Sequence, residues 1–394
     1  MSAREVVILS GVRTAIGDYG GALKDVAATE LAATVVRAAV ARAGIDPNEA
    51  GHLVFGNVIH GEARDMYLAR VACINGGLPQ STSALTLNRL CGSGLQAIIS
   101  SAQTILLSDT DTAVAGGAES MSRGGYLLPA LRWGQRMNDG GTVDMMAGAL
   151  TDPFDNVHMG VTAENIAAKW GISRAEQDSF ALESHRRAIN AIRNGYFKEQ
   201  ILPIELKTRK GTTIFATDEH PRADASIEGL AGLRPVFQKD GTVTAGNASG
   251  INDSAAAVVL MERNAAEKRG LKPMARLVSY AHAGVNPKYM GIGPVPAVQN
   301  AMKRAGLTVA DMDVIESNEA FAAQACAVAR ELHFDPAKTN PNGGAVALGH
   351  PIGATGCILT VKAIYELHRS GGRYALVTMC IGGGQGIAAI FERL

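Results

Sequence analysis

The sequence predicts an α/β protein made of two related halves and an inserted segment. β-Branched apolar runs alternate with alanine-rich amphipathic runs, a pattern typical of strands and helices packed in layers. Many of the 45 glycines fall between these runs, where the chain has to turn. Three pairs of segments also resemble each other at nearly the same separation along the chain, which predicts an internal duplication.

Each pair combines the same element types in the same order. In the first pair, a helix end is followed by a glycine, a linker, an apolar strand and an asparagine. The second pair is a glycine-containing corner before a helix, and the third is an apolar strand that follows this helix. The pairs are 42–57 with 304–318, 87–94 with 347–356, and 111–120 with 374–384. A constant offset predicts that motifs of the first half have counterparts in the second.

The duplication suggests limits for three units. We expect an N-terminal half over 1–120, completed by part of 250–270, and a C-terminal half over 271–394. Residues 121–249 form an inserted loop domain, with a long amphipathic helix that opens on a capping box at Ser173. Long irregular insertions on a rigid scaffold often carry binding sites, so we expect ligand contacts there.

Composition excludes several classes of function. Lysine plus arginine equals aspartate plus glutamate at 37 each, and no basic run appears, so no nucleic-acid partner is expected. No apolar stretch is long enough for a membrane span or a signal peptide, so we expect no membrane association and a cytoplasmic location. The cysteines are odd in number and scattered, which favours a reducing compartment. They are Cys73, Cys91, Cys326, Cys357 and Cys380.

Cys91 and His350 fall at matching corners of the duplication. Each is expected where a strand gives way to a helix, so the two corners can face each other across a pseudo-twofold axis. Free N–H groups at a helix N-terminus lower a thiol pKa, and a nearby imidazole completes a nucleophile pair. A lone cysteine before an apolar helix is usually a small buried residue. The matching histidine corner favours the nucleophile interpretation.

Two further residues end apolar strands of the second half. Cys380 precedes consecutive glycines, whose N–H groups could face an oxyanion. Asn318 could act as a turn residue or hold a water or a carbonyl. A dinucleotide loop is disfavoured because "GGGQG" lacks the G-x-G-x-x-G spacing. No C-x-x-C or H-E-x-x-H appears and the nine histidines are dispersed, so no metal site is expected.

Six blocks of the chain together resemble the thiolases, and the resemblance runs the length of the chain. They are "NRLCGSG" (88–94), "HMGVTAEN" (158–165), "AGNASGINDSAA" (245–256), "NEAFAAQ" (318–324), "NPNGGAVALGHPIGATG" (340–356) and "CIGGGQG" (380–386). The bacterial biosynthetic and β-ketothiolase branch is the most similar. This resemblance implies a layered α-β-α-β-α core. Ser254 stands where glycine is common and Cys357 where a small residue is usual, and neither lies in the signature chemistry.

The resemblance also implies catalytic roles. Cys91 would accept the acyl group as a thioester, and His350 would activate it. Cys380 would be the acid/base that removes or returns a proton on the acetyl-CoA methyl. Asn318 would hold a water that forms one oxyanion hole with His350. The backbone N–H groups of Cys91 and Gly382 would form the second oxyanion hole.

Coenzyme A and acetyl-CoA are implied as substrates, with no permanently bound cofactor. Arg222 would lie near the nucleotide, and Met159, Met290 and Phe321 are expected as walls that limit the acyl chain. The pantetheine channel would be lined by Leu150, His158, Met159, Phe237 and Ser249. The loop over 126–146 is an expected assembly element of a homotetramer, a dimer of dimers.

The implied reaction is the reversible Claisen condensation of acyl-CoA with acetyl-CoA, or thiolysis of short-chain 3-ketoacyl-CoA, by a ping-pong acyl-cysteine mechanism. Two alternatives stay open. A β-ketoacyl synthase shares the duplicated fold but typically uses a Cys–His–His or Cys–His–Asn set. A non-catalytic CoA- or lipid-binding relative should have lost a reactive residue. The preference for four, five or more carbons and the direction of flux are left undetermined by the sequence.

Overall fold

The N-terminal half forms a sheet of mixed direction in the computed structural model, which describes residues 4–208 and 211–394. The strand order is β4 (Ser83–Leu87), β3 (His52–Gly56), β5 (Thr112–Ser120), β11 (Asn252–Glu262) and β1 (Val6–Thr14). β3 runs parallel to β4 and β5, whereas β11 is antiparallel to both β5 and β1. Strand β11 therefore lies inside the N-terminal sheet although it follows the inserted segment in the chain.

The C-terminal half repeats this arrangement. Its order is β13 (Val314–Ser317), β14 (Tyr374–Ile381), β15 (Gln385–Arg393) and β12 (Ala275–Gly284). β13 is parallel to β14, and β15 is antiparallel to both β14 and β12. A short antiparallel ladder between β1 and β12 joins the two halves into one continuous path of strands. The predicted duplication is therefore present as a repeated strand order.

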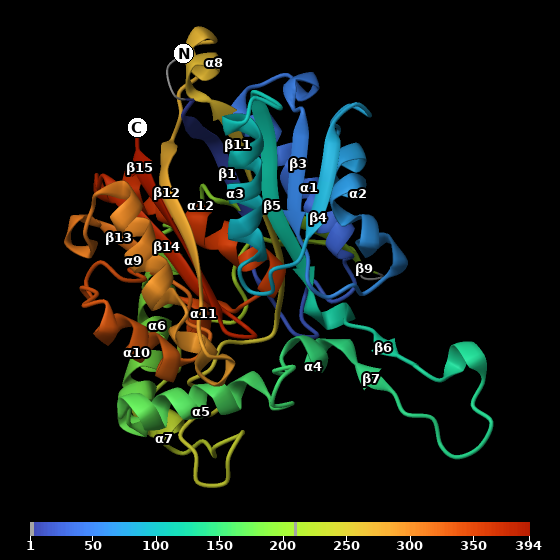
Figure 1. Ribbon diagram of the computed structural model, residues 1–394, viewed down its shortest axis with the longest axis vertical. Coiled ribbons are helices and arrows are strands. Elements are labelled where there is room, and N and C mark those ends of the chain that lie inside the picture. The colour runs from blue at the N-terminus through green and yellow to red at the C-terminus, as the bar shows by residue number, and fades with distance from the viewer. Residues whose placement is uncertain (1–3, 209–210) are drawn as a thin grey trace.

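Helices cover both halves from outside and separate them in the middle. On the N-terminal half, α1 (Ala28–Ala43) and α2 (Leu68–Asn75) pack on the sheet, and α9 (Pro294–Ala305) covers the C-terminal half. α3 (Ser93–Leu106) and α12 (Ile352–Ser370) pack against each other, and α12 contacts strands of both halves (Figure 1). This layering confirms the α-β-α-β-α core that the sequence blocks imply.

The first repeated pair has the predicted local structure in both halves. α1 ends at Gly44 and α9 at Gly306, and both glycines adopt left-handed backbone with φ of 66°. Glycine is favoured there because a β-carbon would clash in this conformation. β3 and β13 follow, each ending immediately before an asparagine, Asn57 and Asn318.

The second repeated pair differs from the prediction. Cys91 lies between strand β4 and helix α3, as expected. The segment before His350 is the short helix α11 (Ala345–Leu348), so the predicted strand at this corner is wrong. Its alanine-rich sequence favours helix, and the side chain of Glu319 accepts a hydrogen bond from Val346 N in the first turn.

The inserted segment contributes helices and small hairpins around the sheet ends. Ser173 caps the long helix α6 by accepting a hydrogen bond from Glu176 N, which is one half of the predicted capping box. The Glu176 carboxylate accepts from Arg330 at 2.8 Å instead of completing the box. β2 pairs with β11, and β8 pairs with β1. The remaining elements of this segment and its neighbours are β2 (Gly17–Asp18), β6 (Tyr126–Leu127), β7 (Val143–Asp144), α4 (Met145–Ala149), α5 (Met159–Trp170), α6 (Arg174–Arg193), β8 (Ile201–Leu202), β9 (Ile204–Thr208), β10 (Gly211–Phe215), α7 (Ile227–Ala231), α8 (Arg263–Lys268) and α10 (Ala322–Glu331).

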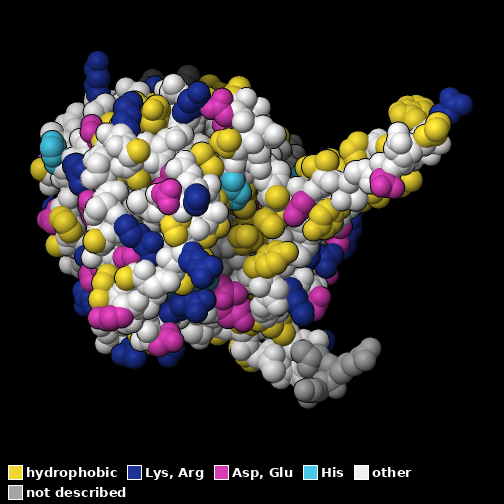
Figure 2. Space-filling model, turned by 90° about the horizontal axis from the view of Figure 1, so that it is seen from below, with side chains coloured by type: hydrophobic (Ala, Val, Ile, Leu, Met, Phe, Trp, Pro, Cys, Tyr) yellow, Lys and Arg dark blue, Asp and Glu magenta, His cyan; other side chains and the backbone are white. Residues whose placement is uncertain are grey.

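Residues 126–144 form an arm that stands away from the body of the protein. The short hairpin β6–β7 forms its base (Figure 1). Hydrophobic side chains follow the arm in the space-filling view (Figure 2). Leu131 is 67%, Trp133 89% and Met137 80% exposed. Within the described residues, no helix combines the length and apolar character that crossing a membrane requires.

Arg13 and Asp218 tie the inserted segment to the core. Both side chains are fully buried, and the guanidinium contacts the carboxylate through two bonds of 2.7 and 2.9 Å. Arg13 Nε also donates to Gln200 Oε1 at 2.8 Å, and Asp218 accepts from Ile16 N at 2.8 Å. The ion pair is bidentate, and the other polar groups of both side chains also have hydrogen-bond partners. It therefore fixes residues 219–222, the loop that follows Asp218, against β1 and β2.

The central helices approach at backbone distance because glycines face the contact. A β-carbon added at Gly94 of α3 would lie 2.7 Å from the backbone nitrogen of Cys357 in α12. One added at Gly356 would collide with the backbone nitrogen of Leu95. The contact lies in the first turns of both helices, so their N-termini converge at the same place.

We expect Gly356→Ala to lower the free energy of unfolding by about 1–3 kcal/mol, because the new methyl would overpack a contact that is bounded by backbone. The midpoint of urea unfolding measures this change. Gly140→Ala is the control, since a β-carbon at Gly140 meets nothing within 4 Å. Equal midpoints for both variants would contradict the close packing of the two helices.

Candidate active site

Cys91 lies where the loop between β4 and α3 meets the turn that follows β14. The residue before it, Leu90, has φ of 44°, and the residue after it, Gly92, lies against Ile381 at the end of β14. The backbone N–H groups of Cys91 itself and of Gly382 both face its sulfur. Gly382 packs closely against Met159, since a β-carbon at position 382 would lie 2.9 Å from the Met159 methyl group. Two backbone donors thus converge beside a thiol.

Cys380 is the neighbouring thiol. It is fully buried in β14, and burial together with the nearby Cys91 thiol raises its pKa well above the ordinary range. Met159, Met290 and Phe321 belong to the buried cluster that surrounds Cys380. The structure therefore brings the two sequence-predicted cysteines together, in apolar surroundings that disfavour charge.

His350 is held in one tautomer. Thr355 Oγ1 donates to Pro351 O at 3.0 Å, so His350 Nδ1 donates to Thr355 Oγ1 at 2.7 Å. Nε2 then carries the lone pair and accepts from Asn318 Nδ2 at 3.4 Å. A neutral imidazole whose Nε2 lone pair makes only this long contact can act as a base at that atom.

Asn318 keeps one polar atom free in the described part of the chain. Its backbone nitrogen donates to Thr378 O at 3.0 Å, which places it beside β14, and its side chain is fully buried. Nδ2 contacts His350, whereas Oδ1 has no hydrogen-bond partner among the described residues. A buried acceptor of this kind can hold a water or a substrate donor.

The protonation states differ from the sequence prediction. Burial raises the pKa of the Cys91 thiol to about 11, although the N–H groups of Cys91 and Gly382 act in the opposite direction. Burial also lowers the pKa of His350 to about 4. The expectation that the helix end ionises Cys91 is therefore wrong, because desolvation outweighs the helix N-terminus. At neutral pH, thiol and imidazole are both uncharged.

Glu119 is a buried group beside the site that the sequence analysis missed. Its carboxyl lies at the end of β5 and accepts from Gly353 N, Val58 N and Ile59 N at 2.8, 3.1 and 3.0 Å. Burial raises its pKa to about 8, and these N–H groups oppose the shift. It joins the start of α12 to the end of β3. A lone strand-end glutamate gives no signal of this role in a single sequence.

A cavity of about 440 Å³ leads to His350. His158 and Phe237 stack in its wall with ring centroids 4.6 Å apart, and Phe321 meets Phe237 edge to face at 6.2 Å. The sequence-predicted residues that line it are Leu150, His158, Phe237, Ser249, Phe321 and His350. The walls therefore come from the inserted segment and the second half, together with Asp18 and Tyr19 of the first half.

Three of the predicted binding residues lie elsewhere. Met159 and Met290 pack around Cys380 instead of lining this cavity. Arg222 lines an adjoining cavity of about 320 Å³, and its backbone nitrogen donates to His185 Nδ1 at 3.2 Å. His220 lines both cavities and was not predicted, because an isolated histidine in a loop gives no local pattern.

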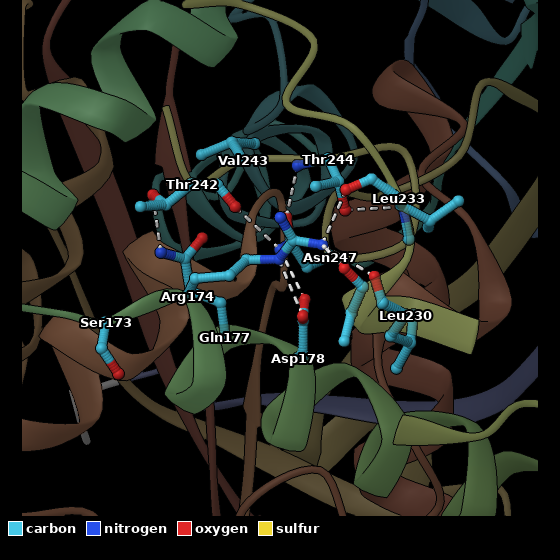
Figure 3. Close-up of polar contacts among 12 residues, drawn as sticks. Ser173, Arg174, Gln177, Asp178, Leu230, Leu233, Thr242, Val243, Thr244 and Asn247 are labelled. Carbon is cyan, nitrogen blue, oxygen red and sulfur yellow. Dashed lines mark hydrogen bonds and ion pairs between the residues drawn. The ribbon is translucent and has the colours of Figure 1, made fainter. Parts of the chain in front are cut away.

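The loop that carries Phe237 and Ser249 is fastened to helix α6 (Figure 3). Arg174 donates to Leu230 O at 2.7 Å and pairs with Asp178 at 2.7 Å. Asp178 in turn accepts from Asn247 Nδ2 at 2.9 Å. This buried network gives the cavity wall a fixed position, since each charge is paired and hydrogen-bonded.

Two thiols, an imidazole base and converging backbone donors in a duplicated α/β fold define an acyl-transferring enzyme that works through a cysteine nucleophile. The chain belongs to the thiolase family. The model of the thiolase N-terminal domain matches residues 6–264, and that of the thiolase C-terminal domain matches residues 271–393. This confirms the resemblance carried by the sequence blocks and disfavours a carrier-protein synthase.

Relatives and solved structures agree. The chain is 69% identical over 392 residues to the β-ketothiolase BktB of Cupriavidus necator, covering 99% of this chain and 100% of the relative. The crystal structure of the Bacillus anthracis acetyl-CoA acetyltransferase has a TM-score of 0.98 at 47% identity, covering 100% and 99% of the two chains. Human mitochondrial 3-ketoacyl-CoA thiolase in complex with CoA has a TM-score of 0.96 at 44% identity, covering 100% and 98%.

We expect the alkylation rate of Cys91 by iodoacetamide to keep rising through pH 9.5, because the thiolate is the reactive form and the pKa lies near 11. Mass spectrometry of the peptide that contains Cys91 measures the rate at each pH. Cys91→Ser controls for the other thiols. A plateau below pH 8 would instead indicate a thiolate–imidazolium pair and contradict the uncharged pair.

Proposed function

We propose that this thiolase moves acyl groups between coenzyme A and carbon through an acyl-Cys91 intermediate. It would condense acyl-CoA with acetyl-CoA or cleave short-chain 3-ketoacyl-CoA in the reverse direction. The observation that carries the proposal is the convergence on one sulfur of two backbone N–H groups, with a second thiol beside it. The names of the relatives, β-ketothiolase and acetyl-CoA acetyltransferase, support it.

In the first half-reaction, His350 Nε2 takes the proton of Cys91 while the sulfur attacks the thioester carbonyl. The negative oxygen that develops needs donors already in place, since one such donor contributes about 3 kcal/mol to transition-state stability. The N–H groups of Cys91 and Gly382 supply them. The CoA thiolate then leaves and takes the proton of the Cys380 thiol, so that Cys380 is left as a thiolate and His350 as an imidazolium. This makes the kinetics ping-pong.

In the second half-reaction, Cys380 in thiolate form takes a proton from the methyl of acetyl-CoA. The carbanion attacks the acyl carbonyl, the bond to Cys91 breaks, and the released Cys91 thiolate takes its proton back from His350. A water held by Asn318 Oδ1, together with the Nε2–H of the protonated His350, would stabilise the enolate oxygen. The methyl proton stays on Cys380, so all three groups return to their resting protonation states.

Coenzyme A serves here as a substrate, with no permanently bound cofactor required. Its pantetheine arm would occupy the cavity lined by Leu150, Phe237 and Ser249, and its nucleotide would reach toward Arg222. Phe321 stands where that cavity meets the cluster around Cys380, and Met159 and Met290 lie within that cluster. These bulky walls favour short acyl chains.

The five cysteines are all free thiols, two of them in the site. A catalytic pair of neighbouring thiols needs a reducing setting to stay unpaired, since thiols are kept reduced in the cytosol. This supports a cytoplasmic location for the reaction.

We expect wild-type protein to cleave acetoacetyl-CoA and 3-ketovaleryl-CoA, and Cys91→Ser to lose at least about a thousandfold in kcat. Loss of the Mg²⁺-enolate absorbance follows thiolysis. Cys380→Ala should still form acetyl-Cys91 from acetyl-CoA but lose deuterium exchange at the acetyl methyl by a factor of about 10² to 10⁴. A folded wild-type protein inactive on both substrates would favour a non-catalytic relative.

We propose a homotetramer in which the arm, residues 126–144 of the expected assembly loop over 126–146, joins two dimers. Its apolar side chains, exposed in one chain, support this because large exposed apolar patches usually mark interfaces. Light scattering should give four times the chain mass of 41.1 kDa. Replacing Leu131 and Trp133 together by serine should lower that mass. A monomeric wild-type mass would overturn the proposal.

A further inference from the structure

Asn252 contacts the backbone of His350 directly. Its Oδ1 accepts from His350 N at 2.9 Å, and the side chain is fully buried in β11. The preceding residue, Gly349, has φ of 103°, and a β-carbon there would collide with the Asn252 amide. A glycine is therefore needed to make room for Asn252 exactly where the chain turns into the catalytic histidine.

The orientation of the Asn252 amide is fixed by its other end. Nδ2 donates to Gly17 O at 3.1 Å and to Asp18 Oδ1 at 3.2 Å. Reversing the amide would place its N–H groups against His350 N–H and its oxygen against two acceptors. The contacts with Gly17 and Asp18 thus decide that Oδ1 faces His350.

Asp18 connects this amide to the cavity wall. Its Oδ1 contacts His220 Nδ1 at 2.5 Å, and its backbone nitrogen donates to Glu219 Oε2 at 2.8 Å. Asp18, His220 and His350 all line the same cavity. A hydrogen-bonded chain therefore runs from the cavity wall through Asn252 to the backbone of His350.

We propose that Asn252 is a positioning residue for His350 and that Asp18, paired with His220, holds Asn252 in its working orientation. The inference rests on the proposed role of His350 as the base toward Cys91. The ring of His350 is aimed by its own backbone and by Thr355. Loss of the backbone bond lets the peptide at Gly349 rotate, and a displacement of about 1 Å of a reacting group costs on the order of 10²-fold in rate.

The test is a double-mutant cycle with Asn252→Ala, Asp18→Ala and both together. Asn252→Ala should lower kcat for acylation of Cys91 by about 10- to 100-fold with little change in KM, because Asn252 does not line the cavity. Asp18→Ala should lower kcat less. In the Asn252→Ala background it should add nothing further to the loss of kcat, since Asp18 acts on His350 through Asn252.

Ser254→Ala is the matched control. Ser254 is equally buried in the same strand and bonds Thr14 Oγ1 at 2.8 Å, without contact to His350. It should match Asn252→Ala in thermal midpoint and keep wild-type kcat. Equal kcat losses in both variants would reduce Asn252 to a structural residue and overturn the inference. Additive effects of the two alanine changes would overturn the part assigned to Asp18.

Modification of His350 by diethyl pyrocarbonate in each variant, followed by mass spectrometry, separates this inference from the proposed function, because it needs no substrate and His350 lines the cavity. An inactive wild type would end the proposed function. A changed rate of His350 modification in Asn252→Ala but not in Ser254→Ala would still support the positioning of the base. Equal modification rates in an active enzyme, with equal kcat, would end the positioning role alone.

Discussion

The backbone contact between α3 and α12 is the constraint on which the site depends. Both helices lie between the two halves of the sheet, so they have no room to separate, and glycines let their N-terminal parts touch. Cys91 lies two residues before α3, and His350 lies two residues before α12. Convergence of the two helix starts places Cys91 against the cluster that contains Ile352, the first residue of α12. Glu119 strengthens this contact by joining the first turn of α12 to the end of β3.

The same burial sets the chemistry of the site. Desolvation keeps Cys91 as a thiol and His350 as a neutral imidazole, so charge has to develop during reaction instead of standing in the resting enzyme. Hydrogen-bond donors in a low-dielectric site act more strongly on such transient charge than donors in water. The closed, apolar surroundings of Cys380 would likewise strengthen the effect of hydrogen-bond donors on the charge of a carbanion. The reaction rate then depends more on the position of each donor than on the charge of the thiol and imidazole in the resting enzyme.

The inserted segment supplies access without disturbing this core. The buried pair of Arg13 and Asp218 fixes one of its loops to β1, and the network around Asp178 fixes another to α6. These attachments hold the walls of the cavity in front of the catalytic residues. The arm leaves the body and carries its exposed apolar side chains outward (Figure 2). The insertion thus supplies much of the cavity wall and the exposed apolar arm, whereas Cys91, His350 and Cys380 lie on the duplicated scaffold.

The sequence by itself determined the duplication, the layered α/β class and the family, and it singled out Cys91, His350 and Cys380 as candidate residues, because motif order and helix–strand periodicity are local properties. It did not determine the helix before His350, the protonation of the thiol, or the parts taken by Glu119, Asn252 and His220. These depend on burial and on contacts between residues far apart in the chain. Desolvation and hydrogen-bond partners exist only once the two halves and the insertion have packed, so tertiary structure alone decided them.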